Sequence, residues 1–433
     1  MHDKPFSPTT HIRVLLAALL CSLATGCELV TMARFSYDNA TAPHSWHNGT
    51  GTTTVPFSLV DNHIILPVRV NDSAPLNFVL DSGAAASVLI DSRGSRALKL
   101  QPSSTITVSG VGNGPDPTAA VIRDTTLGVG SLEMEEQSLI HLPLEAIPFF
   151  RELDDAYFDG VIGAPFFSRF LVAIDYGRME ISFSEPGYFS EPGDEEQQQP
   201  GAGWQSVPLE IISGVPYLHT RVSNDNGTPV DVMLLADTGA RGTVSLTPAT
   251  HAELEPPRYY YSEVGQGLSG DVISRVTMAP SLTLANYQLG HLPVSYDIDG
   301  GEQEAGSNGI LGNEILRRFN LVFDYSSDRL YLQPNDNFSD SLEADRSGLQ
   351  VRPHTAGAIV RKVAGDSTAS KSGLAEGDII TSFDGIAVTP TTIAGLKRAL
   401  TSHAAAIHLC WTAASLNHCE DVALAPRMSQ HET

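Results

Sequence analysis

The chain has 433 residues, of which 42% are apolar and 18% are charged. This is enough apolar material for two or three folded domains, and it excludes a chain that is disordered throughout. The formal net charge is -24, and because a polyanion is bound by clustered Lys and Arg side chains, this balance argues against a nucleic-acid partner.

The N-terminus has the pattern of an export signal. Lys4 and Arg13 precede an apolar run over residues 14–26. That run is shorter than the roughly 20 residues that a membrane-spanning helix needs. We therefore expect residues 1–26 to be a signal peptide that is removed on export.

The apolar run ends in LATGC, which resembles the processing site of a bacterial lipoprotein. The resemblance implies that the thiol of Cys27 is lipidated and becomes the mature N-terminus, and ordinary signal-peptidase cleavage is the alternative. Glu28 stands where an Asp is associated with inner-membrane retention, which favours the outer membrane. We expect the polar residues 27–54 to form a flexible tether between a lipid anchor on the periplasmic face and the folded body.

Two apolar runs further along the chain are followed by similar polar residues, Asp-Ser-Gly in FVLDSGAAASVLI (78–90) and Asp-Thr-Gly in LLADTGARGTVSL (234–246). Burying a carboxylate in this way is costly unless hydrogen bonds or a shared proton compensate. Each aspartate is therefore either fully hydrogen-bonded or present for its chemistry. The matched positions are Asp81 with Asp237, Ser82 with Thr238, and Gly83 with Gly239.

A second pair of similar segments follows at similar range, in DGVIGAPFFSRFLVAIDYG (159–177) and NGILGNEILRRFNLVFDYS (308–326). Each contains two apolar residues followed by glycine. A duplication of this size predicts two similar, mainly β lobes related by a pseudo-two-fold axis, with one short helix after each apolar-apolar-Gly motif. The two aspartates can then meet at that axis.

These repeated motifs resemble aspartic proteases, specifically the retropepsin-like group, over about residues 55–335. The resemblance implies retropepsin-type lobes fused in one chain in the manner of pepsins, with Asp81 and Asp237 as the catalytic pair and no metal or organic cofactor. It also implies that four neighbours support the active-site loops, namely Ser82, Gly83, Thr238 and Gly239.

Two carboxylates about 3 Å apart share one proton and titrate as a pair. Such a pair supplies an acid and a base together, as hydrolysis of a peptide bond by an activated water requires. Two glycine-rich segments, 108–115 and 263–271, are candidate flaps over an extended peptide, and ordinary hairpin turns are the alternative. Arg241 either pairs with a substrate carboxylate or lies on the surface.

The C-terminal part resembles a PDZ domain of the kind attached to bacterial envelope proteases, on GAIVRKVAGDSTASKSGLAEGDIITSFDGIAV (357–388). Such a domain binds a C-terminal peptide by adding a strand to a sheet edge, and a PDZ domain that only packs on the protease is the alternative. Gln350 replaces the usual second glycine of the carboxylate-binding loop. The resemblance places that loop at Gly348, Leu349, Gln350 and Val351.

Cys410 and Cys419 flank a predicted hairpin near the C-terminus. An exported domain favours a disulfide between them. With His408 and His418 they could instead bind a metal, but the spacing matches no known zinc pattern, so we expect no metal site.

Together these patterns predict a mainly β protein in which two tandem retropepsin-like β-barrel lobes form one bilobal aspartic protease, followed by an α+β PDZ domain. The expected function is endopeptidase cleavage of envelope polypeptides by a monomer with an intramolecular site. A non-catalytic peptide-binding or regulatory scaffold is the rival, and lobes that pair between chains are a third hypothesis. The expected segments are 1–26 signal peptide, 27–54 tether, 55–185 N-terminal lobe, 186–203 linker, 204–335 C-terminal lobe and 340–426 PDZ domain.

Overall fold

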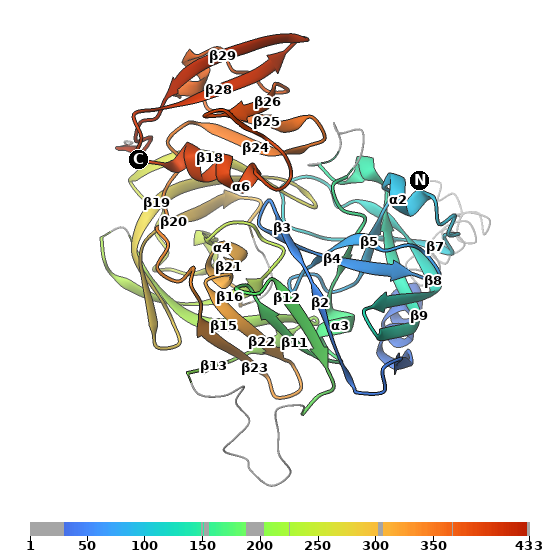
Figure 1. Cartoon of the computed structure of the whole chain (residues 1–433). Coiled ribbons are helices and arrows are strands. Elements are labelled where there is room, and N and C mark those ends of the chain that lie inside the picture. The colour runs from blue at the N-terminus through green and yellow to red at the C-terminus, as the bar shows by residue number, and fades with distance from the viewer. Residues whose placement is uncertain are drawn as a thin grey trace, which may run out of the picture.

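The structure is a computed structural model that describes residues 30–148, 150, 156–187, 203–224, 226–301, 306–365 and 367–430. The expected signal peptide and Cys27 lie outside these residues, as do positions 188–202 of the expected linker. Two β lobes carry a smaller α+β domain, which lies above them in Figure 1. Among the helices so described, none is long and apolar enough to cross a bilayer.

The N-terminal lobe is built around a strongly curved sheet that closes on itself where β8 and β9 pair. Its strands, in spatial order, are β1 (His44–Trp46), β9 (Leu132–Leu142), β6 (Val88–Ile90), β10 (Gly160–Ile162), β5 (Leu76–Leu80), β4 (His63–Val70), β8 (Thr118–Val129) and β7 (Ser104–Thr107), with β3 (Ser58–Val60) paired to β4. Three short helices join them, α2 (Arg93–Arg96), η1 (Leu144–Ala146) and α3 (Ala164–Phe167).

The C-terminal lobe repeats this arrangement. Its sheet runs through β14 (Glu210–Ile212), β15 (Val215–Ser223), β16 (Pro229–Asp237), β21 (Gly309–Gly312), β17 (Val244–Leu246), β20 (Tyr287–Asp299), β19 (Gly270–Leu284), β18 (Tyr259–Gly267) and β30 (Ser429–Gln430). The short helices are η2 (Pro248–Thr250) and α4 (Asn313–Leu316). The expected short helix after each apolar-apolar-Gly motif is therefore confirmed, as α3 and α4.

A third sheet joins the lobes with three strands from each. Its order is β13 (Gln205–Pro208), β23 (Arg329–Pro334), β22 (Phe319–Asp324), β11 (Leu171–Asp175), β12 (Glu180–Ser184) and β2 (Thr52–Pro56). At its centre β11 and β22, the strands that follow the two short helices, pair antiparallel with Ala173 opposite Val322. The pseudo-two-fold axis of the duplication therefore passes between these two strands.

One hydrophobic core runs through both lobes and the sheet that joins them. Phe78, Phe166 and Val172 from the first half belong to the same buried cluster as Leu234 and Phe323 from the second half. Burial of this apolar surface is the main favourable term in folding, so the two lobes are expected to unfold as one unit.

The C-terminal domain has its own core and is the PDZ region. Its sheet runs through β24 (Leu349–His354), β25 (Gly357–Val363), β26 (Ile379–Phe383), β28 (Ala406–Ala413) and β29 (Leu416–Ala423), with β27 (Ile386–Ala387) paired to β26. Helices α5 (Thr368–Lys371) and α6 (Ile393–Thr401) complete it, and α6 buries Ile393, Leu396 and Leu400 in the core. The expected fold class, two β lobes followed by an α+β PDZ region, is confirmed.

Candidate active site

Asp81 and Asp237 stand at equivalent places, at the ends of β5 and β16. In each lobe this strand pairs in parallel with the strand of the apolar-apolar-Gly motif, β10 in the first lobe and β21 in the second. The loop after each aspartate then folds over the motif's glycine. A Cβ on Gly163 would approach the carbonyl oxygen of Ala86 to 2.6 Å, so only glycine fits beneath this loop.

The short helices α3 and α4 hydrogen-bond to the same aspartate loops. The first amide of α3, at Ala164, donates to the carbonyl oxygen of Ala84 at 2.8 Å. The first amide of α4, at Asn313, donates to the carbonyl oxygen of Ala240 at 2.6 Å. The apolar-apolar-Gly motif and its helix thus hold the aspartate loop of their own lobe.

The hydroxyl groups that follow the aspartates tie the lobes together. Ser82 Oγ donates to the carbonyl oxygen of Ala236 at 2.6 Å, and Thr238 Oγ1 donates to that of Leu80 at 2.8 Å. Each hydroxyl also accepts from the backbone N–H of the other residue, at 3.0 Å in both directions. Both side chains are buried, so four reciprocal hydrogen bonds fix one aspartate loop against the other.

The two carboxyl groups meet at the axis and hydrogen-bond to each other. Each glycine that follows an aspartate faces the carboxyl group of the other lobe. A Cβ on Gly83 would lie 2.6 Å from Asp237 Cγ, and one on Gly239 would overlap the Asp81 carboxyl group. Any larger residue at either position would therefore force the carboxyl groups apart.

Burial and the neighbouring carboxylate raise the pKa of Asp81 well above its usual range. Burial also raises the pKa of Asp237, but hydrogen bonds oppose this rise. Asp237 Oδ1 accepts from the N–H groups of Gly239 at 2.7 Å and Ala240 at 3.0 Å, whereas Asp81 Oδ1 accepts from Gly83 at 2.8 Å. Hydrogen bonds to the ionised form favour it, so these bonds favour the shared proton on Asp81, while the two groups titrate as one pair.

The two glycine-rich segments, 108–115 between β7 and β8 and 263–271 at the turn between β18 and β19, meet each other. Gly114 N–H donates to the carbonyl oxygen of Ser269 at 2.6 Å, and Ser269 N–H donates to that of Val111 at 3.0 Å. The Ser269 hydroxyl adds a hydrogen bond to Asp116 at 2.6 Å. The segments are therefore hairpin turns whose tips are joined across the two lobes.

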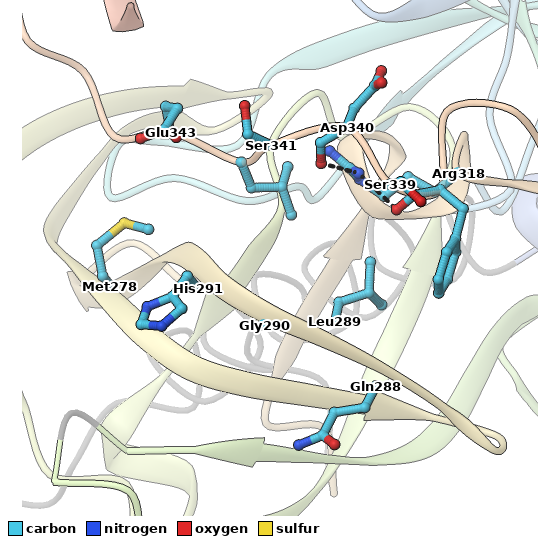
Figure 2. Close-up of a pocket in the computed structure, with 12 residues that line it drawn as sticks. Met278, Gln288, Leu289, Gly290, His291, Arg318, Ser339, Asp340, Ser341 and Glu343 are labelled. Carbon is cyan, nitrogen blue, oxygen red and sulfur yellow. Dashed lines mark hydrogen bonds between the residues drawn. The ribbon is translucent and has the colours of Figure 1, made fainter. Parts of the chain in front are cut away.

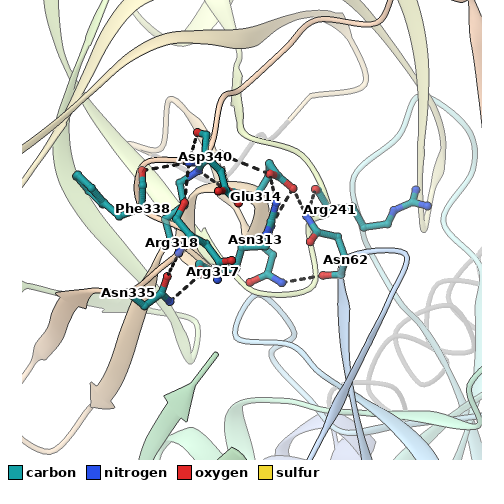
Figure 3. Close-up of polar contacts among 10 residues, drawn as sticks. Asn62, Arg241, Asn313, Glu314, Arg317, Arg318, Asn335, Phe338 and Asp340 are labelled. Atoms are coloured by element: carbon teal, nitrogen blue, oxygen red, sulfur yellow. Dashed lines mark hydrogen bonds and ion pairs between the residues drawn. The ribbon is translucent and has the colours of Figure 1, made fainter. Parts of the chain in front are cut away.

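Sequence patterns did not reveal the turn between β3 and β4, which braces the Asp237 loop. Figure 3 shows Asn62 of this turn between Arg241 and Asn313. Asn62 Nδ2 donates to the carbonyl oxygen of Arg241 at 2.8 Å, and Asn313 Nδ2 donates to that of Asn62 at 2.7 Å. Asp61 pairs with the Arg241 guanidinium at 2.6 Å, so Arg241 is neither a surface charge nor free to meet a substrate carboxylate.

Other residues that match between the two halves of the repeat have structural roles. Arg169 donates to the carbonyl oxygens of Asn39 and Ala42. Arg318 donates likewise to Asn337 at 3.0 Å, Phe338 at 3.2 Å and Asp340 at 2.6 Å (Figure 3). Asp175 and Asp324 each accept a backbone N–H in the turn that follows.

A cavity of about 530 Å³ lies beside Arg318 (Figure 2), and neither Asp81 nor Asp237 lines it. Its lining includes Met278 and His291 from β19 and β20 and Glu343 from the segment before the PDZ domain. Arg318 is directed at backbone carbonyl groups of that segment. The cavity thus lies beside the segment that Arg318 holds by hydrogen bonds. Among the described residues, its lining contains no second pair of hydrogen-bonded carboxyl groups.

In the PDZ domain, the expected carboxylate-binding loop lies at the start of edge strand β24. Its donors already have internal partners, because Gly348 N–H donates to Asp345 at 2.8 Å and Leu349 N–H donates to Ser347 Oγ at 3.0 Å. The Gln350 side chain donates to Glu263 of β18 at 2.9 Å, and Val351 is buried in the domain core. This loop therefore contacts the protease lobe rather than solvent alone.

At the far end of the PDZ sheet, Cys410 and Cys419 face each other on β28 and β29 and form a disulfide. His408 and the two sulfur atoms lie close together. Because the sulfur atoms are bonded to each other, neither offers a thiolate to a metal.

Comparison with known proteins matches two families. The aspartyl protease family matches residues 66–166, and the PDZ domain family matches residues 347–406. Among solved structures, the aspartic proteinase from Irpex lacteus is similar over 67% of this chain and 99% of its own, with 15% sequence identity and a TM-score of 0.39. None of the curated proteins matches the chain.

Proposed function

Starting from a chain that contains an aspartyl protease domain and a C-terminal PDZ domain, we propose an aspartic endopeptidase with Asp81 and Asp237 as its catalytic pair. The supporting observation is the pair of hydrogen-bonded carboxyl groups at the pseudo-two-fold axis. The reciprocal bonds of Ser82 and Thr238 hold the two aspartate loops against each other. Purely structural carboxylates would be separated or paired with cations instead.

The chemistry follows from the position of the shared proton. Ionised Asp237 takes a proton from a water held between the carboxyl groups while that water's oxygen bonds to the carbonyl carbon of the substrate. Asp81 donates its proton to the carbonyl oxygen. In the tetrahedral intermediate Asp237 returns its proton to the leaving nitrogen, the C–N bond breaks, and Asp81 recovers a proton from a hydroxyl group.

The joined hairpin tips at Val111 and Ser269 supply a cover for the substrate. An extended peptide can hydrogen-bond its backbone to such hairpins, which gives affinity without dependence on sequence. Their contact would have to open for a polypeptide to enter, and closing again would exclude water from the carboxyl pair.

We also propose that the protein acts in the cell envelope as a monomer with its site within one chain. The apolar segment before Cys27 supports export and lipid attachment, and the PDZ domain supports recruitment or sensing of a polypeptide end. The substrates would then be exported polypeptides that reach the periplasmic face of the membrane.

Cleavage of unfolded casein by purified residues 28–433, followed across a pH series, tests the proposal. We expect cleavage by the wild type, inhibition by a statine-type compound, and loss of cleavage in both Asp81→Asn and Asp237→Asn. An Asp81→Asn protein with full turnover would refute the intramolecular pair. Peptide binding without cleavage at any pH would identify the protein as a binding scaffold.

A further inference from the structure

The turn between β3 and β4, residues 60–63, joins three parts of the molecule. It is a two-residue turn in which Asp61 has φ of 51° and Asn62 has φ of 68°. Such left-handed pairs form tight hairpins and suit Asp and Asn. The turn is therefore a rigid projection from the N-terminal lobe, and the side chain of Asp61 at its tip is 0% exposed.

The first partner of this turn is the Asp237 loop. His63 lies with Nε2 3.0 Å from the carbonyl oxygen of Gly239 and Nδ1 2.7 Å from the Tyr157 hydroxyl. A carbonyl oxygen can only accept, so Nε2 carries the hydrogen and Nδ1 accepts from Tyr157. Burial lowers the pKa of His63 to about 3, which keeps this neutral tautomer.

The second partner is Arg241, in the same loop. Its guanidinium pairs with Asp61 at 2.6 Å, and its carbonyl oxygen accepts from Asn62 at 2.8 Å. The turn thus contacts the Asp237 loop at three points: the carbonyl oxygen of Gly239, the carbonyl oxygen of Arg241 and the guanidinium group of Arg241. All three contacts lie within four residues of Asp237.

The third partner comes from the PDZ domain. Lys397 of α6 donates to Asp61 Oδ1 and forms an ion pair with it. In Figure 1 the blue hairpin at β3 reaches the red helix α6. Arg352 of β24 adds positive charge nearby. Burial alone would raise the pKa of Asp61, but Lys397, Arg241 and Arg352 outweigh it and lower that pKa, so Asp61 is ionised.

A buried carboxylate is tolerated only while its cations remain in place. Removing Lys397 leaves the buried Asp61 carboxylate with one fewer cation to fix its position. The turn that carries Asp61 is then held less rigidly, and the Asp237 loop, which the turn contacts through Asn62 and His63, loses part of its support. Placement of a catalytic group within a fraction of an ångström governs the rate, so the effect should reach the carboxyl pair.

We propose that Asp61 is a positioning residue for the Asp237 loop, and that the PDZ domain supports the protease site directly by pairing Lys397 with Asp61. This inference rests on the proposed endopeptidase function. It gives the PDZ domain a second task besides binding polypeptide: any ligand or partner that draws α6 away from the turn lowers the rate of cleavage.

The test compares Lys397→Met with Lys397→Arg and with Arg398→Ala, which removes the next and exposed cation of α6. The substrate is a short peptide, too small to reach both domains. We expect Lys397→Met to lower kcat by about ten- to a hundredfold with KM within about twofold, and the other two variants to stay near wild type. Wild-type kcat in Lys397→Met would overturn the proposal.

Hydrogen exchange of the amides in residues 237–243 gives a readout that does not need turnover. We expect faster exchange in both Asp61→Asn and Lys397→Met, with the remaining lobe segments unchanged. Lys397→Met should add little to Asp61→Asn in the double variant, since both act through one pair. Fully additive effects, or unchanged exchange in both single variants, would overturn the proposal.

These two readouts also separate the inference from the proposed function. If the wild type cleaves nothing, the endopeptidase proposal fails, and the exchange experiment alone decides whether Asp61 and Lys397 support the loop. A thermal unfolding curve for each variant shows that the lobes and the PDZ domain remain folded.

Discussion

Asp81 keeps a proton in the folded protein that the unfolded chain releases near the ordinary carboxyl pKa. Because burial and Asp237 raise the pKa of Asp81, the stability from this site is complete below the ordinary pKa and is lost as pH rises through the raised pKa. Asp81→Asn cannot titrate, so we expect its Tm to fall less than that of the wild type between about pH 5 and 8. Scanning calorimetry at matched ionic strength measures both. Parallel pH profiles would contradict the raised pKa.

The same pKa sets the alkaline limit of activity. Catalysis needs one proton on the pair, and the raised pKa of Asp81 delays loss of that proton. We therefore expect kcat/KM to hold well above the ordinary Asp pKa of about 4 and to extend toward neutral pH. A profile of kcat/KM on a peptide without titratable side chains measures it. A decline already complete by about pH 5 would disprove the expectation.

The side chains of Thr238 and Ser82 differ by one methyl group, yet each hydroxyl donates to a carbonyl oxygen of the other lobe and accepts a backbone N–H from it. Thr238→Ser should therefore keep both bonds and nearly full stability. Thr238→Ala leaves the Ser82 N–H and the Leu80 carbonyl oxygen buried without this partner, which costs about 1–3 kcal/mol of unfolding free energy. Urea denaturation of the two variants measures the difference, and equal stability would show that the hydroxyl groups do not hold the lobes together.

At the scale of elements, the two hairpin tips fit together only because glycines lie at their crossing. A Cβ on Gly267 of β18 would overlap the carbonyl group of Val111. Gly365 in the PDZ domain has open space around it and is a matched control. We expect Gly267→Ala to change KM for a peptide by on the order of tenfold or more, and Gly365→Ala to leave it unchanged. Identical KM values would exclude tip contact during turnover.

The repeated elements could be predicted because each motif carries its own local signal. The two apolar runs ending in Asp, and the two apolar-apolar-Gly segments, predicted two lobes, two short helices and the meeting of Asp81 with Asp237. Joining of the tips at Val111 and Ser269 could not be predicted, because it depends on the distance between two lobes and not on either hairpin.

The contacts of Asp61 with Arg241 and Lys397 could not be predicted either, for a physical reason. Asp61 and Asn62 carry a turn signal, which says nothing about what the turn touches. Arg241 follows the active-site motif, so a substrate contact or a solvated position was the natural expectation. The actual partner of Arg241 is Asp61, which lies 180 residues earlier in the chain. Asp61 also pairs with Lys397, which belongs to another domain. Such long-range ion clusters leave no periodic trace in a sequence.

At the scale of the whole molecule, the central pairing of β11 with β22 has a consequence for how the chain is made. The N-terminal lobe is complete when β12 emerges from the ribosome, long before β22 exists. Until then β11 is an unsatisfied sheet edge, open to the same strand of a neighbouring nascent chain. A truncated chain ending after β12 should therefore self-associate through β11.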